Sequence, residues 1–115
     1  HLGRLFSDEV VCLVSREHPA VRRGWSTEEW LAAEHIAPTP THPGARGVID
    51  GHLDGLGLRR HVTARCAHFS LIPEIVASSL LVLTTGRQFC QRYVGQLPLR
   101  IVRCPVAFPP MSYYQ

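Results

Sequence analysis

The stretch from residue 65 to residue 87 constrains the fold of this chain most strongly. A polar turn with His68 and Phe69 follows a short strand pattern, and residues 70–79 then have the spacing of a short amphipathic helix. An apolar strand pattern at residues 80–84 ends on Thr84 and leads into a second polar turn. This alternation predicts an α/β sheet with His68, Phe69 and Thr84 at the ends of neighbouring strands. Small ligands bind at that edge of open α/β sheets.

The rest of the chain continues the same alternation. Residues 9–15 form an apolar run suited to a strand buried on both faces, and Ser26 with Glu29 forms a capping box at a helix start. Further strands are predicted at residues 35–37, 61–66 and 99–103, and further helices at residues 48–56 and 87–94. The short connections between these elements predict a mostly parallel sheet with helices on both faces.

Composition indicates a folded cytoplasmic domain that needs no metal or cofactor. The 115 residues fit one domain with a modest core, and the 18% of charged residues is typical of a globular chain. The net charge is only +3 and the arginines are scattered, which argues against a nucleic-acid surface on this segment. The given residues show no signal-peptide pattern and no apolar run that could span a membrane, so we expect no membrane partner. The four cysteines form no CxxC pair and are predicted to be reduced core thiols.

Two loops carry side chains suited to binding a small anion. Prolines restrict residues 38–44, and Thr39, Thr41 and Arg46 lie around the next helix start, where backbone amides favour anions. The alternative is a solvated loop with an exposed arginine. His68 suits a phenol or carboxylate, but it could equally cap its own helix. Thr84 could face a ligand or cap the helix that follows it.

Catalytic motifs are absent from the sequence. It contains no Gly-x-Ser-x-Gly elbow, no Gly-x-x-x-x-Gly-Lys phosphate loop and no Gly-x-Gly-x-x-Gly fingerprint. Cys66 and His68 share one face of a strand, but no oxyanion site or orienting partner is evident beside them. The seven histidines show no metal-ligand spacing. We therefore expect a binding protein and not an enzyme, with a small hydrolase that uses Cys66 or His68 as the weaker alternative.

Several strings occur along the chain in a characteristic order. They are Leu5-Phe6-Ser7-Asp8-Glu9-Val10-Val11-Cys12-Leu13-Val14 followed by His18-Pro19, then Arg46-Gly47-Val48-Ile49-Asp50, Gly57-Leu58-Arg59-Arg60, His68-Phe69 and Leu80-Leu81-Val82-Leu83-Thr84. Their order and spacing resemble the effector-binding domain of LysR-type transcriptional regulators, in particular the NodD-like branch that responds to aromatic acids. The resemblance covers nearly the whole chain. It implies the fold of type 2 periplasmic binding proteins, in which two crossover strands join two lobes and the inducer binds between the lobes.

Under this resemblance the chain is one partial domain. An entering crossover strand would occupy about residues 5–17, the second lobe about 18–105 and the returning crossover about 106–115, with the DNA-binding domain and the first lobe before them. The ligand would be a small aromatic or carboxylate effector, DNA would be bound only through the N-terminal domain, and the full-length regulator would form a dimer or tetramer. The implied ligand-binding residues are Thr39, Thr41, Arg46, His68, Phe69 and Thr84. A transport-type solute-binding lobe with the same fold is the main alternative.

Overall fold

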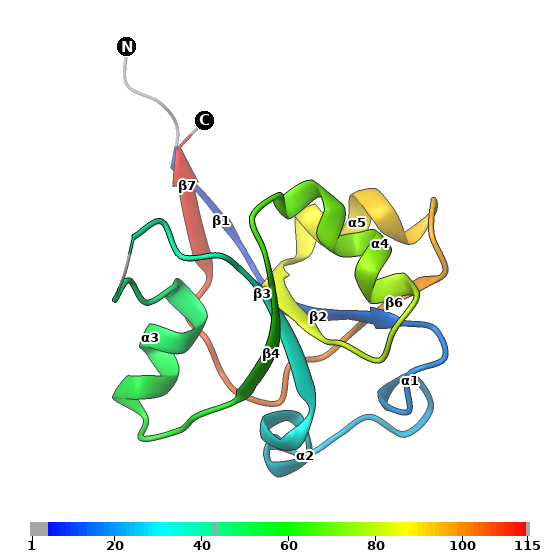
Figure 1. The fold of residues 1–115 in the computed structure, drawn as a ribbon, viewed down its shortest axis with the longest axis horizontal. Helices are drawn as coiled ribbons and strands as arrows, with labels where there is room; N and C mark the ends of the chain where they lie inside the picture. The colour runs from blue at the N-terminus through cyan, green and yellow to red at the C-terminus, as the bar shows by residue number, and fades with distance from the viewer. Residues whose placement is uncertain (1–4, 43, 115) are drawn as a thin grey trace.

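The chain forms a central β-sheet with short helices packed around it (Figure 1). The computed structural model describes residues 5–42 and 44–114. In chain order the elements are β1 (Leu5–Asp8), β2 (Val10–Ser15), α1 (Ala20–Arg23), α2 (Thr27–Ala32), β3 (Glu34–Pro38), α3 (Val48–Gly55), β4 (His61–Cys66), the 3-10 helix η1 (Phe69–Leu71), α4 (Ile72–Ala77), β5 (Leu83–Gly86), α5 (Arg87–Val94), β6 (Leu99–Val102) and β7 (Met111–Tyr114).

Strand directions in the central sheet are mixed. β2 pairs antiparallel with β5 on one side and β6 on the other, whereas β3 pairs parallel with β4. A parallel bridge from His35 to Val82 joins the two parts, so the strand order is β4-β3-β5-β2-β6. The prediction of a mostly parallel sheet is therefore wrong for the pairs that involve β2. A strand buried on both faces has the same apolar pattern in either direction, so its residues do not reveal how it runs.

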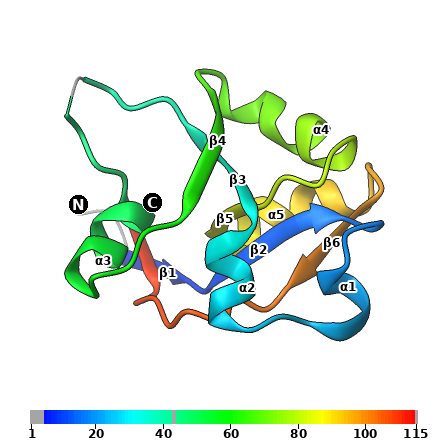
Figure 2. The same ribbon diagram turned by 60° about the horizontal axis from the view of Figure 1, so that its bottom comes forward.

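Helices cover both faces of the sheet, as predicted, and β2 lies between them (Figure 2). Val11 and Leu13 pack with α4 and α5 on one face, whereas Cys12 and Val14 pack with α2 and α3 on the other. These four side chains are at most 1% exposed. Each fully buried apolar side chain of this size contributes about 1.5–3 kcal/mol, so the two clusters on β2 hold the helices against the sheet.

The predicted capping box at the start of α2 is confirmed. At the start of α2, the Ser26 hydroxyl accepts a hydrogen bond from the Glu29 amide at 3.1 Å, and the Glu29 carboxylate accepts one from the Ser26 amide at 2.9 Å. β4 and α5 have the predicted bounds. The predicted helix over residues 70–79 is instead η1 followed by α4, with Pro73 in the first turn of α4. The α1 turn was not predicted.

The strand predicted over residues 80–84 begins later than expected, with β5 at Leu83. The amide of Leu81 donates a hydrogen bond to the Ser79 hydroxyl at 3.2 Å, which prolongs the turn after α4. Val82 then makes only the bridge to His35 before regular pairing with β2 starts. The side-chain bond of Ser79 therefore delays the strand.

The predicted entering strand, residues 5–17, is divided at Glu9 into β1 and β2. β1 leaves the central sheet and pairs antiparallel with β7, in a register that runs from Asp8 opposite Met111 to Leu5 opposite Tyr114. β1 and β7 thus form a separate two-stranded ribbon at one end of the molecule (Figure 1). No helix within residues 5–42 and 44–114 has the length and apolar character needed to cross a membrane.

Candidate functional site

A cavity of about 720 Å³ lies where β3, β4 and β5 meet α3 and α5. The end of β3 and its following loop, the first turn of α3 and one face of α5 form most of the wall, and Asp8 of β1 and Met111 of β7 also contribute. Small-molecule sites in proteins commonly measure about 300–1,000 Å³. The cavity therefore has the size and the position in the fold expected for a small-ligand site.

Most of the residues predicted to bind ligand line this cavity. Thr39, Thr41, Arg46, Phe69 and Thr84 all contribute to its wall. His68 does not, although it is adjacent to Phe69. It is exposed at the start of η1, and its backbone carbonyl accepts the hydrogen bond of the Leu71 amide. His68 therefore lies at a helix start, but its side chain makes no capping hydrogen bond there.

Two threonines in the middle of β5 belong to the cavity wall. Thr84 and Thr85 are 5% and 9% exposed and both line the wall. The hydroxyl of Thr84 lies 3.5 Å from the sulfur of Cys12, which in turn accepts a hydrogen bond from the Trp30 indole at 3.2 Å. The cavity wall at Thr84 is thus connected by polar contacts to the core of the α2 face.

An aromatic wall extends from the turn after β4 to α5. The rings of Phe69 and Phe89 lie 4.4 Å apart between centroids, and the ring of Tyr93 lies 5.1 Å from that of Phe89. Phe69 and Phe89 line the cavity. Such a tilted pair offers an apolar surface to the edge or the face of a ligand ring. Phe89 was not predicted as a site residue, although its place in the correctly predicted α5 was a usable signal.

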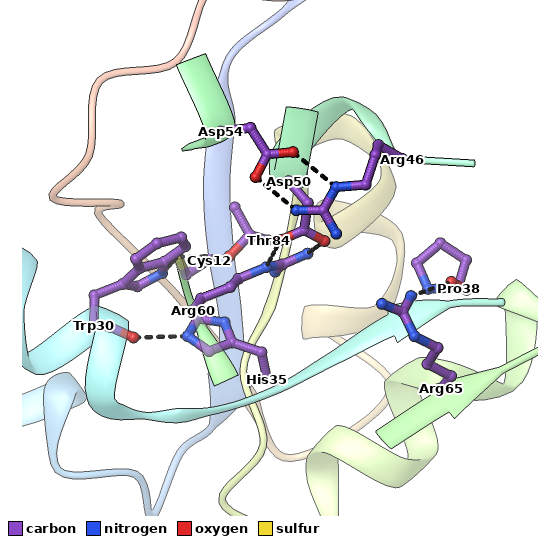
Figure 3. A network of polar contacts seen from close by, with 10 residues as sticks. All are labelled: Cys12, Trp30, His35, Pro38, Arg46, Asp50, Asp54, Arg60, Arg65 and Thr84. Atoms are coloured by element: carbon purple, nitrogen blue, oxygen red, sulfur yellow. Dashed lines mark hydrogen bonds and ion pairs between the residues drawn. The ribbon is translucent and has the colours of Figure 1, made fainter. Parts of the chain in front are cut away.

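Two of the four arginines in the wall are already paired with carboxylates (Figure 3). Nε and Nη2 of Arg46 both donate to Asp54 at 2.8 Å, and this hydrogen bonding raises the pKa of Arg46. Nε and Nη2 of Arg60 donate to Asp50 at 2.8 and 3.0 Å. Burial opposes ionisation of Asp50, but the hydrogen bonds and charge of Arg60 hold the pKa of Asp50 below its usual value. Among the described residues, Nη1 of Arg60 is buried and has no hydrogen-bond partner, so this guanidinium keeps one donor outside its ion pair.

The other two arginines, Arg65 and Arg92, form no ion pair with a described residue. The Arg65 guanidinium donates one hydrogen bond, to the backbone carbonyl of Pro38 at 3.1 Å (Figure 3). Arg92 lies on α5, three residues after Phe89, and so on the same side of that helix. Both side chains belong to exposed residues in the wall. Arg65 and Arg92 are therefore the two wall arginines that have no carboxylate partner among the described residues.

A buried polar layer lies behind Arg60. His35 is fully buried, and its Nε2 donates to the Trp30 carbonyl at 2.6 Å (Figure 3). Burial lowers the pKa of His35 to about 4, so the ring is neutral at physiological pH. Since Nε2 is the donor, Nδ1 is the unprotonated nitrogen. His35 therefore adds no positive charge to the floor of the site.

The described residues offer no metal site and little support for a hydrolase. Within residues 5–42 and 44–114, no three His, Cys, Asp or Glu side chains gather in a way that could hold a metal ion. The Cys66 thiol donates to the backbone carbonyl of His68 at 3.3 Å. A nucleophilic thiol would need a base within hydrogen-bond reach, and this thiol is directed to an amide oxygen.

Comparison with protein families decides what kind of domain carries this cavity. A family model described as the LysR substrate binding domain matches residues 1–114. The chain belongs to the LysR substrate-binding domain family. This confirms the family that the sequence strings resemble. It also places the cavity in a domain family named for binding a small molecule.

Curated relatives of this LysR domain are named as transcriptional regulators and nodulation proteins. The activator NagR of Ralstonia sp is 29% identical over 105 residues, 91% of this chain and 31% of NagR. The regulator SyrM of Rhizobium etli is 31% identical over 109 residues, 92% of this chain and 31% of SyrM. Nodulation protein D 2 of Rhizobium tropici is 25% identical over 108 residues, 94% of this chain and 34% of that protein. The chain spans about a third of the length of these relatives.

Solved structures share the fold of this domain. The probable transcriptional regulator PA0477 of Pseudomonas aeruginosa superposes with a TM-score of 0.81 at 27% identity, covering 96% of this chain and 37% of that one. The effector-binding domain of BenM with benzoate gives a TM-score of 0.66 at 14% identity, covering 95% and 52%. That of QuiR with shikimate gives 0.70 at 12% identity, covering 99% and 52%. The last two comparisons concern the fold alone.

Proposed function

We propose that this LysR domain binds a small aromatic carboxylate in the cavity of about 720 Å³ and thereby regulates transcription. One observation carries the proposal: an aromatic pair, Phe69 and Phe89, and two arginines without carboxylate partners, Arg65 and Arg92, line the same cavity. The rings would contact the ligand ring, and the arginines would hold its carboxylate. The hydroxyls of Thr84 and Thr85 would bind a further polar substituent.

The relatives support a sensor that is part of a longer regulator. We infer that residues 5–17 and 106–115 are the two crossover strands and that residues 18–105 form one lobe, since β1 and β7 pair with each other away from the central sheet. The effector would bind between this lobe and a second one. DNA would be bound by another domain of a cytoplasmic homo-oligomer. An effector acts on such a regulator only through different affinities for its two states.

In this proposal Arg46 does not bind the ligand carboxylate, although the sequence suggested that it would. Both of its donor atoms in the ion pair are held by Asp54, so recruiting Arg46 to a ligand would break two hydrogen bonds of 2.8 Å. We propose that Arg46 and Asp54 shape the cavity wall at α3, and that Thr39 and Thr41 form its rim. The carboxylate is assigned to Arg65 and Arg92, which carry free charge.

Isothermal titration calorimetry with the full-length protein tests the proposal. The probes are benzoate, its neutral isostere benzamide, and the non-aromatic cyclohexanecarboxylate. Arg92→Gln and Arg65→Gln should each weaken benzoate binding about tenfold, since a charge-assisted hydrogen bond at an exposed side chain contributes about 1.4 kcal/mol. Phe89→Leu should remove the preference for benzoate over cyclohexanecarboxylate. The two arginine substitutions should leave benzamide affinity within about twofold, whereas Phe89→Leu should weaken the binding of both aromatic probes, benzoate and benzamide.

The matched control is Arg22→Gln on α1. It removes the same charge from an exposed side chain that does not line the cavity. Benzoate affinity should not change in this variant. Benzamide binding as tightly as benzoate would contradict the assigned carboxylate site. If Arg22→Gln weakened benzoate binding as much as Arg92→Gln does, benzoate affinity would depend only on net charge. That result would also contradict the assigned carboxylate site.

A further inference from the structure

The start of α3 lies in the wall of the main cavity and offers backbone donors that no described residue uses. Gly47 is the N-cap of α3, and Gly47, Val48 and Ile49 all line the cavity. No group in the described part of the chain accepts a hydrogen bond from the amides of Val48 and Ile49, and the backbone bonds of the helix begin with that of Gly51 to the Gly47 carbonyl. Free amides at a helix start favour an anion, because they donate hydrogen bonds and carry the positive end of the helix dipole.

The N-cap residue cannot satisfy these amides, because Gly47 has no side chain. Its backbone is extended, with φ −69° and ψ 171°, a conformation that any residue can adopt. Among the described residues, nothing lies within 4 Å of the place that a Cβ would take. Neither conformation nor space therefore requires glycine at this position. Its consequence is an uncapped helix start in the cavity wall, whereas the hydroxyl of Ser26 caps α2.

A buried arginine in the same wall also has a donor without an acceptor. Arg60 lines the cavity, and its side chain is 4% exposed. Its Nε and Nη2 donate to Asp50 in the first turn of α3, so the guanidinium is attached to the same helix start (Figure 3). Its Nη1 is buried and has no hydrogen-bond partner among the described residues. Buried donors in native proteins nearly always have an acceptor, so an orphaned donor on a cavity-lining residue indicates where a ligand atom belongs.

The carboxylates around this helix start are all engaged. Both oxygens of Asp50 accept from Arg60, and both oxygens of Asp54 accept from Arg46. The carboxylate of Asp8, on β1, accepts from a backbone amide at the start of α5. We refer to the two free amides at the start of α3 together with Nη1 of Arg60 as the α3 subsite. It consists of donors alone, which suits a group that only accepts hydrogen bonds, such as a carboxylate.

We propose that the α3 subsite binds a second anionic group of the effector, and that the effector is an aromatic acid with two carboxylates. This inference rests on the proposed function, in which one carboxylate binds Arg65 and Arg92. The second carboxylate accepts hydrogen bonds from the α3 amides and from Nη1 of Arg60. The Arg65 guanidinium lies apart from the pair of Arg60 and Asp50 (Figure 3). The ligand therefore carries its two carboxylates at separate positions of the ring.

Isothermal titration calorimetry of the full-length protein with benzoate, phthalate, isophthalate and terephthalate tests the α3 subsite. In wild type, the best of the three dicarboxylates should bind about tenfold more tightly than benzoate, since its second carboxylate gains charge-assisted hydrogen bonds. Gly47→Ser should reduce this ratio to about one, because the serine hydroxyl caps the α3 amides without changing the charge. Arg60→Met combined with Asp50→Leu should also lower the ratio, because it removes Nη1 and leaves neither buried charge unpaired.

The matched control is Gly51→Ser, the same substitution four residues later in α3 and outside the cavity wall. It should leave the ratio at its wild-type value. An unchanged ratio in Gly47→Ser would overturn the α3 subsite. So would benzoate binding that responds to Arg65→Gln and Arg92→Gln while no dicarboxylate binds more than threefold more tightly, and that result would leave the proposed function intact. If none of the four acids binds, both proposals fail.

Discussion

The buried ion pair between Asp50 and Arg60 offers the sharpest test of how the cavity is built. It links the first turn of α3 to the residue that precedes β4, and both side chains lie in the cavity wall. We consider three variants: Arg60→Met, Asp50→Leu and the double substitution. Each single variant leaves one buried charge without its partner, whereas the double variant removes both charges.

The expected magnitudes follow from burial and geometry. The side chains of Arg60 and Asp50 are 4% and 11% exposed, and two hydrogen bonds of 2.8 and 3.0 Å join them. Removing one partner of a buried pair costs about 3–5 kcal/mol, whereas replacing both by apolar residues is often neutral. We therefore expect each single variant to lose about 4 kcal/mol of unfolding free energy, and the double variant to lie within about 1 kcal/mol of wild type.

Urea denaturation followed by far-UV circular dichroism measures these differences. With a slope of about 2 kcal/mol per molar urea, each single variant should unfold at about 2 M lower urea than wild type. The pKa of Asp50 is lowered in the folded state, so its contribution is present above about pH 4 and is lost as pH falls through the folded pKa. The double variant should lack this loss. Single variants that cost under 1 kcal/mol, or a double variant as unstable as the singles, would refute the reasoning.

Three further predictions concern local structure and stability. Ser26→Ala should lower the unfolding free energy by about 1 kcal/mol in thermal denaturation, because it removes the cap of α2; no loss would contradict the cap's importance. Gly57→Ala should lower the unfolding free energy by about 1 kcal/mol, because Gly57 has φ +72°. Gly51→Ala should raise the unfolding free energy by about 0.5–1 kcal/mol, because Gly51 lies in the middle of α3 with open space where a Cβ would be. Equal effects of the two substitutions would refute this prediction. Burial lowers the pKa of His35 to about 4 in the folded state, so on acidification the unfolded chain takes up this proton at higher pH than the folded chain does. The unfolding free energy should therefore fall as pH is lowered from about 6.5 to 4. His35→Gln should flatten this pH dependence in urea titrations, and an unchanged pH dependence would contradict burial as the cause.

Local signals in the sequence were sufficient to locate most of the helices and strands. The capping pair of Ser26 and Glu29 located α2, and the apolar pattern located β2 to within one residue. The direction of β2 could not be found in this way. It depends on pairing with β5 and β6, whose paired residues lie 70 or more positions away in the sequence. The local pattern of a doubly buried strand is the same in both directions.

The sequence predicted the site residues that lie in loops or at strand ends. It did not predict those whose place in the wall depends on which face of a helix turns toward the cavity. Phe69 and Thr84 were found because the ends of neighbouring strands meet at one edge, and Thr39 was found because it lies in a proline-restricted loop before a helix start. Arg92 was missed because its place in the wall depends on which face of α5 turns inward, although its spacing from Phe89 carried the signal. The commitment of Arg46 to Asp54, eight residues later, is a tertiary contact that neither residue reveals alone.

The ribbon of β1 and β7 determines how mechanical load would enter this domain. The outermost pair of the ribbon is Leu5 with Tyr114 and the innermost is Asp8 with Met111, and the free ends of both strands point the same way (Figure 1). Tension that separates those ends would break the interstrand hydrogen bonds one after another, as in unzipping, and not all at once. The two strands of the ribbon would therefore separate at low force. The five-stranded sheet and its cavity would then stay unstretched while the ribbon opens.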